Sequence, residues 1–475
     1  MRRVELRLGR NAQRQRWDGD ALNAAPTLYA LHALGSSARE FDGLSARLQS
    51  RLRVVGIELP GFGDEPVTDD LSVAGLADHV IARIVRDGAQ RWMLAGHSMG
   101  GKVASVVAAR VLNGTANLFG LTGVVLLAAS PPTPEPMAEE RRAQMLSWVQ
   151  DGPLGTAEAR TFIDMNIGSP LDPADDAVAE SDLRRASPVA WRHWLESGSR
   201  EDVSDAVGVL DLPAVVLGGD DDEDLGAKAQ PDLHGRFYPR ARFVTLPGAG
   251  HLLPYERTDA VADAALALWD EIERSAPAVP AQWSALIASS RTDQRVRATL
   301  ARRAIADDPE YAPQVLTPAA MSALRALADV VVPQPDGPRI DLAARVDAQL
   351  HRGEGDGWRV ADMPPDPEAY RSGLDAIASA MEGDMGKRRA AVRSILDESF
   401  TPPKGWTGQQ LSAWFEDARV DLVRQWMAHP ATMAHIGYDG FATGGTVLPL
   451  RGFSDLRQGA RDAWEPTELG EERSV

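Results

Sequence analysis

The sequence contains no cysteine among its 475 residues. This absence excludes disulfide bonds, thiolate metal sites, iron–sulfur clusters and catalysis by a thiol. A chain without disulfides suits a reducing compartment.

A long apolar run is also missing. The longest candidate, residues 121–129, has about the length of a β-strand and is too short to cross a bilayer. Arg2 and Arg3 form a twin arginine, but the amphipathic residues 4–8 stand where a signal peptide would have its apolar segment. We therefore expect no membrane span, no signal peptide and a cytoplasmic protein.

Basic residues are not in excess. Lys and Arg number 50 against 68 Asp and Glu, which gives a formal net charge of −18. Nucleic-acid binders concentrate basic side chains, so nucleic acid is not expected as a partner. A chain of this length exceeds what one hydrophobic core normally serves, so two domains are expected.

Up to about residue 272, short apolar runs alternate with longer amphipathic ones, which is typical of a parallel sheet with crossover helices. The predicted strands are Thr27–His32, Leu52–Leu59, Trp92–Gly96, Gly123–Ala128, Ala214–Gly218 and Arg242–Leu246. The predicted helices are Ala38–Gln49, Val73–Arg86, Gly101–Val111 and Asp259–Arg274.

The alternation stops between about residues 130 and 209, where the chain is rich in proline and contains helical pieces at Glu139–Val149 and Pro188–Glu196. An insertion between two strands of such a sheet is usually a lid over the site. A first domain is thus predicted over residues 1–274, with its lid at about 130–209.

Residues 275–281 are rich in alanine and proline and are predicted to be a linker. Residues 282–475 are predicted to form a second, mainly α-helical domain. Its expected helices are Pro318–Val330, Ile340–Leu350, Tyr370–Met381, Arg388–Leu396 and Leu411–Trp426.

The segment Gly-His-Ser-Met-Gly at residues 96–100 follows an apolar strand and precedes a helical run. In this context Gly-x-Ser-x-Gly forms a tight turn that projects its serine above the sheet, and flanking glycines prevent collisions. The helix that follows favours negative charge developing at its N-terminus. Ser98 is therefore the predicted nucleophile.

A serine hydroxyl needs a base. His251 lies in a glycine-rich loop after the last predicted strand, as the order serine, acid, histidine requires. The acid should follow the preceding strand, where residues 220–224 offer several carboxylates. Counting from Pro213 favours Asp222, with Asp221 as the alternative. The backbone N–H groups of Met99 and Leu34 are the expected oxyanion hole.

These motifs, together with the Leu-Pro-Gly-Phe-Gly turn at residues 59–63, resemble the α/β-hydrolase superfamily. The resemblance covers about residues 1–272. It implies a mostly parallel sheet with helices on both faces and a helical lid. The family's usual His-Gly pair in the oxyanion loop is His32-Ala33 here, a departure that could shift this loop slightly.

A serine at position 98 excludes the members of this fold that use an aspartate nucleophile. Carboxylesters, lactones, thioesters and the carbon–carbon bonds of β-diketone-like acids remain as substrates. Trp148, Trp191 and Trp194 could line an apolar acyl pocket, and packing of the lid onto the sheet is the alternative. Lys102 is expected to be a surface residue rather than a substrate clamp.

The second half carries helical and turn segments at residues 316–333, 341–350, 370–376 and 429–440 that together resemble the gluconate 2-dehydrogenase subunit 3 family. That resemblance implies a helical subunit without a cofactor of its own that accompanies a FAD-dependent, GMC-type dehydrogenase. His351, His429 and His435 lack metal-ligand spacing and are expected to make ordinary polar contacts.

The sequence therefore predicts a serine hydrolase for a small ester or lactone, without metal or cofactor, joined to a domain that docks a flavoprotein dehydrogenase. The alternative is a non-catalytic accessory or scaffold subunit of such a dehydrogenase, in which the hydrolase fold serves only packing.

Overall fold

The predicted strands form one parallel sheet in the computed structural model, which describes residues 26–355, 363–402, 406–445 and 447–467. The order across the six-stranded sheet is β2-β1-β3-β4-β5-β6. The strands are β1 (Thr27–Leu31), β2 (Arg53–Ile57), β3 (Trp92–His97), β4 (Leu121–Leu127), β5 (Ala214–Gly219) and β6 (Ala241–Leu246). Their bounds all lie within two residues of the predicted ones.

Both faces of the sheet are covered by helices, which explains why the central strands are apolar without interruption. In β1, Tyr29 and Leu31 contribute to one hydrophobic core, and Leu28 and Ala30 to another. The first core includes α2 (Val73–Asp87) and α3 (Met99–Leu112), and the second includes α1 (Asp42–Leu48) and α11 (Thr258–Ser275). The alternation of side chains along a strand therefore divides one apolar run between two cores.

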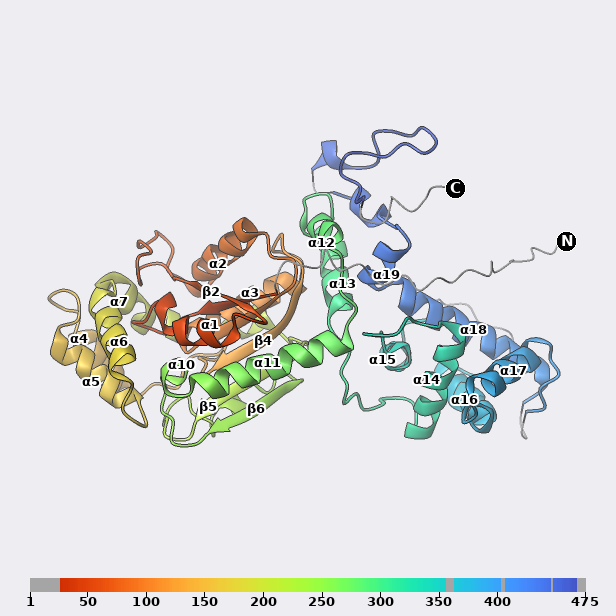
Figure 1. The fold of residues 1–475 in the computed structure, drawn as a ribbon, viewed down its shortest axis with the longest axis horizontal. Helices are drawn as coiled ribbons and strands as arrows, with labels where there is room; N and C mark the ends of the chain where they lie inside the picture. Colours follow the sequence, from red (N-terminus) through yellow and green to blue (C-terminus); the bar gives the residue numbers. More distant parts are fainter. Residues whose placement is uncertain (1–25, 356–362, 403–405, 446, 468–475) are drawn as a thin grey trace.

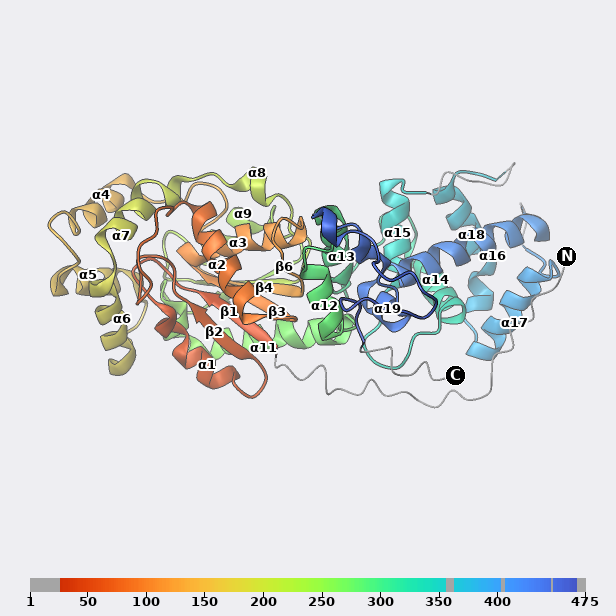
Figure 2. The same cartoon turned by 90° about the horizontal axis from the view of Figure 1, so that it is seen from above.

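The lid lies between β4 and β5, as predicted, and its larger helices gather at one end of the molecule (Figures 1 and 2). These helices are α4 (Glu139–Ser147), α5 (Thr156–Asn166), α6 (Pro173–Arg185) and α7 (Pro188–Glu196). Three further short helices lie in loops of the sheet unit: α8 (Ser204–Val207), α9 (Gln230–His234) and α10 (Leu253–Glu256).

A second group of helices has its own hydrophobic core and lies at the end of the molecule opposite the lid (Figures 1 and 2). These helices match the five predicted ones: α14 (Pro318–Val331), α15 (Leu342–Arg352), α16 (Asp366–Met381), α17 (Met385–Leu396) and α18 (Gly408–Met427). None of the helices in the described part of the chain is long and apolar enough to cross a membrane.

The helices α12 (Ala281–Ala288) and α13 (Gln294–Ala304) follow the expected linker, but they pack on the sheet unit. Ile287, Leu300 and Ile305 belong to the same core as α2 and α3. The guanidinium of Arg297 is buried and donates to the carbonyl of Gly114, 2.9 Å away. The two hydrophobic cores thus divide after α13, although the sequence suggested a division at residues 275–281.

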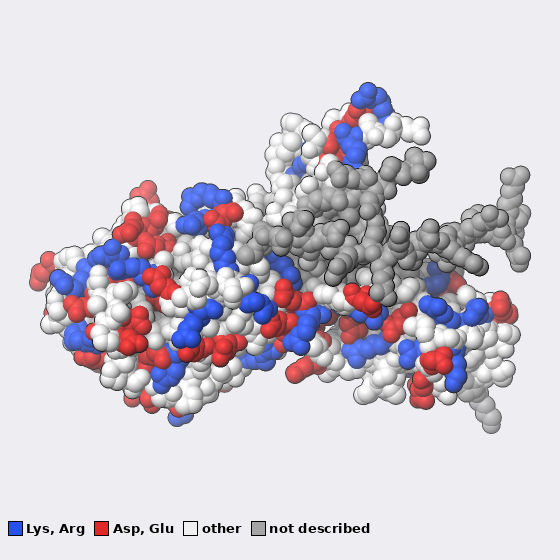
Figure 3. Space-filling view, in the orientation of Figure 1, with Lys and Arg blue, Asp and Glu red and all other residues white. Residues whose placement is uncertain are grey.

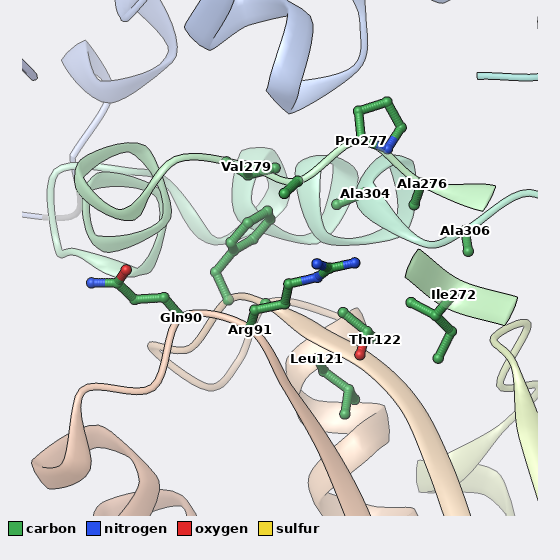
Figure 4. Close-up of a pocket in the computed structure, with 13 residues that line it drawn as sticks. Gln90, Arg91, Leu121, Thr122, Ile272, Ala276, Pro277, Val279, Ala304 and Ala306 are labelled. Atoms are coloured by element: carbon green, nitrogen blue, oxygen red, sulfur yellow. The ribbon is translucent and has the colours of Figure 1, made fainter. Parts of the chain in front are cut away.

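A narrow recess lies at the amino ends of β3 and β4 (Figure 4). Its other walls are formed by α11, by the segment that follows α11 and by the end of α13. It encloses about 30 Å³, room for about one or two water molecules. The guanidinium of Arg91 in this recess lies 4.6 Å above the ring of Trp269. The recess is a seam between packed elements and is too small for an organic ligand.

We expect a chain that ends at Pro280 to be less stable than one that ends after α13. Cutting at Pro280 uncovers the apolar surface of α3 on which Leu300 and Ile305 pack, whereas a chain ending at Glu310 keeps it covered. The shorter chain should unfold about 5–10 °C lower in a thermal melt followed by circular dichroism. Equal melting temperatures would place the boundary at the linker instead.

Candidate active site

Ser98 occupies the turn between β3 and α3 with a backbone conformation that non-glycine residues rarely adopt. Its φ is 49° and its ψ is −118°. Its N–H donates to the carbonyl of Leu127, and its own carbonyl accepts from the N–H of Ser130, both at 2.9 Å. The end of β4 therefore holds the strained turn from both sides.

Two glycines let three backbones meet at this turn. A Cβ on Gly96 would lie 2.5 Å from the carbonyl oxygen of Gly100, and a Cβ on Gly100 would collide with the carbonyl oxygen of Leu31. The amino end of α3 can thus approach the end of β1, where the predicted oxyanion loop begins. These collisions are the physical reason for glycine on both sides of the serine.

The structure brings His251 and Asp222 together. His251 Nδ1 donates to Asp222 Oδ2 at 2.7 Å, and the other carboxylate oxygen accepts from the N–H groups of Asp224 and Leu225, each at 3.1 Å. The side chain of Asp221 is exposed, and its backbone N–H is bonded to the carbonyl of Ala249. Of the two alternatives, only Asp222 contacts the imidazole.

The histidine loop lies against the residue before the serine. His97 Nε2 donates to the carbonyl of His251 at 2.8 Å, and the two rings are 5.3 Å apart between centroids. His97 is itself fully buried beside Glu40, with 3.2 Å between Nδ1 and Oε1. The ends of β3 and β6 are therefore joined at the point where Ser98 begins the turn.

The charges of the pair act on each other. Burial raises the pKa of Asp222, but the facing imidazole and four hydrogen-bond and charge contacts outweigh it and lower the pKa to about 2. Burial lowers the pKa of His251, but the charge and hydrogen bond of Asp222 outweigh it, so that the pKa is raised above 6.5. Asp222 therefore stays ionised near neutral pH and favours the protonated form of His251.

The predicted oxyanion donors border the same turn. Met99 is the first residue of α3, so its N–H has no acceptor within the helix. For the N–H of Leu34 no acceptor exists among the described residues. His32 holds the loop of Leu34: its Nδ1 donates to the carbonyl of Ala33 at 2.8 Å, and its Nε2 accepts from the N–H of Leu59 at 3.0 Å.

The three lid tryptophans differ in burial. Trp191 is fully buried, with Nε1 donating to the carbonyl of Met145 at 3.0 Å and its ring against Gly35 in the oxyanion loop. Trp194 is also buried, and Trp148 is partly buried and meets Phe162 edge to face. All three pack the lid, and a contact of any of them with substrate stays a prediction.

Lys102 is not a surface residue, contrary to the expectation from sequence. It is fully buried, and its ammonium donates to the carbonyls of Gly198, Ser199 and Glu201 at 3.3, 3.2 and 2.9 Å. Burial lowers the pKa of Lys102 to about 8. The lysine next to the serine turn thus fastens the end of the lid to α3, and only its position beside the motif could have suggested this role.

Sequence reasoning also missed Glu135. The hydroxyl of Ser130 donates to Glu135 Oε2 at 2.7 Å, and Ser130 is the residue whose N–H holds Ser98. Burial raises the pKa of Glu135, and the charges of Lys102 and His251 act against this effect. A second carboxyl group therefore faces the imidazole, from a proline-rich loop that gave no sequence signal.

The remaining histidines singled out above do not gather. His429 is buried and caps α19 (Pro430–His435), where its Nδ1 accepts from the N–H of Ala431 at 3.1 Å, and His351 is exposed. Within the described ranges, no three His, Asp or Glu side chains come together as metal ligands would.

Two family models match the chain. Residues 28–264 match the family model "Alpha/beta hydrolase family", and residues 318–440 match "Gluconate 2-dehydrogenase subunit 3". The chain therefore consists of an α/β-hydrolase domain followed by a gluconate 2-dehydrogenase subunit 3 domain, as the sequence motifs predicted.

Among curated proteins, the hydrolase half is similar to pimeloyl-[acyl-carrier protein] methyl ester esterases. It is 26% identical to that of Neisseria meningitidis serogroup B over 242 residues, 50% of this chain and 91% of the relative. It is 29% identical to that of Aeromonas hydrophila over 251 residues, 48% of this chain and 88% of the relative. A solved enol-lactonase from Burkholderia xenovorans is 21% identical, with a TM-score of 0.45, and covers 54% of this chain and 95% of its own. The family match and the similarity to curated esterases place the first domain among esterase-like α/β-hydrolases.

We expect Asp222→Asn to lower the pKa of His251 by about 1–2, because it removes the negative charge that favours the imidazolium. Asp221→Asn should leave that pKa unchanged, since the Asp221 side chain is exposed. Titration of ¹³C-labelled histidine by NMR, with His251 assigned through His251→Gln, measures both. An equal shift in the two variants would show that Asp222 has no special influence on the ring.

Proposed function

We propose that this protein hydrolyses a carboxylester or lactone through an acyl-enzyme, with Ser98 as nucleophile, His251 as general base and Asp222 as the acid that orients it. The proposal rests chiefly on one juxtaposition. The strained serine turn lies beside a histidine whose far nitrogen is bonded to a buried carboxylate at 2.7 Å. A non-catalytic subunit that kept this fold only for packing would not need Ser98, His251 and Asp222 in this arrangement.

In the proposed reaction His251 Nε2 takes the proton of Ser98 Oγ, which attacks the substrate carbonyl. The tetrahedral oxyanion accepts hydrogen bonds from the N–H groups of Leu34 and Met99. As the intermediate collapses, the carbon–oxygen bond to the alcohol breaks, and His251 returns its proton to that oxygen. Water, deprotonated by His251, then attacks the acyl-serine and releases the acid.

The lactone case differs only in that the departing alcohol stays attached to the acyl group. The similar curated proteins are methyl ester esterases by name, which favours an oxygen ester over the carbon–carbon bonds and thioesters that the motif also permits. The predicted apolar acyl pocket is retained only for Trp148, which is partly buried, because Trp191 and Trp194 are buried in the packing of the lid.

For the second domain we propose docking of a FAD-dependent dehydrogenase subunit. The support is the match of residues 318–440 to the gluconate 2-dehydrogenase subunit 3 family. Oxidation of a cyclic hemiacetal yields a lactone, which the first domain would open by the reaction above. Figure 3 shows acidic and basic side chains interspersed over the visible face of the described residues, so this face offers no field of one sign for steering.

We expect Ser98→Ala to abolish ester turnover and labelling by a fluorophosphonate, because no other group can form the acyl-enzyme. His251→Ala should lower kcat by about 10³–10⁶-fold, as losses in triad enzymes do. The assays are hydrolysis of chain-length-graded nitrophenyl esters and of γ- and δ-lactones, with circular dichroism to verify folding. Wild-type turnover by Ser98→Ala would refute the mechanism, and no turnover or labelling of the wild type would favour the accessory-subunit alternative.

The full chain, purified under mild conditions from its native host, should carry a flavin-containing partner, and a chain ending at Glu310 should not. The partner would be detected by flavin absorbance and mass spectrometry. Flavin in neither preparation would remove the docking proposal, and flavin in both would move the binding surface to the hydrolase domain.

A further inference from the structure

Arg141 lies in the first turn of the lid helix α4, where it contacts the loop of Asp222 directly and the loop of His251 through Asn166, the last residue of α5. We infer that Arg141 is a positioning residue that makes the geometry of this pair depend on the seating of the lid. The inference rests on the proposed function, because it assigns a role in the same catalytic site.

The first contact reaches the loop of the acid. Arg141 Nη1 donates to Asp224 Oδ2 at 2.6 Å. The backbone N–H groups of Asp224 and of Leu225 donate to Asp222 Oδ1, which leaves Oδ2 for the imidazole. Fixing Asp224 thus fixes the two donors that orient the carboxylate.

The second contact reaches the loop of the histidine. Arg141 Nη2 donates to Asn166 Oδ1 at 2.9 Å, and the amide nitrogen of Asn166 donates to the carbonyl of Phe162 at 2.7 Å, so the amide orientation is defined. The backbone carbonyl of Asn166 accepts from the N–H groups of His251 at 2.7 Å and Leu252 at 3.2 Å. One planar guanidinium therefore joins the acid loop to the end of α5 that holds the histidine loop, which suits its fork of fixed donors.

The helix that carries Arg141 is itself tied to the rest of the lid. The next residue, Arg142, is buried and donates to Ser199 Oγ at 2.6 Å, and Trp191 Nε1 donates to the carbonyl of Met145 in the same helix. A displacement of the lid from the sheet unit would therefore break the bond between Arg141 and Asp224 and the bond between Asn166 and the N–H of His251. The loops of Asp222 and His251 would each lose a support.

The guanidinium also carries charge toward the imidazole. The ionisable groups that face His251 are the carboxylates of Asp222 and Glu135, which favour its protonated form, and Arg141, which opposes it. The buried His97 and Glu40 lie behind it at the serine turn. Removing the Arg141 charge should therefore make His251 slightly more basic, an effect that a purely structural contact would not have.

The test compares Arg141→Gln with Arg160→Gln. Arg160 is a matched control because it is also a lid arginine that bonds two side chains, the carboxylates of Asp164 and Asp176. Among the described residues it bonds neither the loop of Asp222 nor that of His251. We expect Arg141→Gln to lower kcat about 10–100-fold with KM changed less than about threefold, and to move the acid limb of kcat/KM to higher pH. Arg160→Gln should have the kcat, the KM and the acid limb of kcat/KM of the wild type.

Asp224→Asn should reproduce part of the loss, and the double variant should be no worse than Arg141→Gln, because the two residues act through one contact. If Arg141→Gln does not fold, Arg141→Lys replaces it: the charge is kept, so the acid limb stays, but a single ammonium cannot span both partners and kcat should still fall.

Wild-type kcat in the folded Arg141 variant would overturn the inference, and so would additive losses in the double variant. If the wild type hydrolyses none of the substrates, the proposed function has failed. The pKa of His251, measured by NMR, then still decides whether Arg141 acts on the His251–Asp222 pair. A higher pKa in Arg141→Gln but not in Arg160→Gln then supports the contact, and equal values reject it.

Discussion

The close meeting of three backbones at Ser98 is the constraint on which the rest of the site depends. The turn after β3 can approach the end of β1 because Gly100 has no side chain, and the end of β4 because Gly101 has none, since a Cβ on Gly101 would lie 2.4 Å from that of Ala129. Ser130 and Leu127 then hold the serine in its strained conformation through backbone hydrogen bonds. The oxyanion loop, the serine and the loop of Glu135 all take their positions from this packing, since each begins at one of the three strand ends.

The strands could be predicted because each central one is buried on both faces, so its whole length is apolar. The lid helices α5 and α6 were not predicted. In α6 the many acidic and basic residues leave little apolar periodicity, and its local signals are Pro173 at the start, an acidic first turn and a basic last turn. The packing of α12 and α13 on the first core was hidden for a different reason. A proline-rich segment such as 275–281 signals a break in secondary structure, and it says nothing of which core the next helix joins.

Within the site, residues in the motifs were predictable and residues that reach it from elsewhere were not. Ser98 and His251 stand in glycine-rich turns whose steric purpose can be read locally. The choice of Asp222 over Asp221 for the contact with His251 came from counting along one loop, and the hydrogen bond agrees with it. Lys102 bonds lid carbonyls 96 to 99 residues away, Arg141 bonds Asp224 83 residues away, and Glu135 bonds Ser130, whose N–H donates to Ser98. Nothing local distinguishes these three residues from surface charges.

The segment after α11 and the end of α13, which lead to the helical domain, meet the sheet at the amino ends of β3 and β4, whereas Ser98, Asp222 and His251 follow the carboxyl ends of their strands. The helices α14–α18 are thus joined to the sheet unit at the end of the molecule opposite the lid (Figure 1). A partner docked on them, as proposed above, would leave the lid uncovered. Substitutions on α14–α18 could then change partner binding without changing the site beneath the lid.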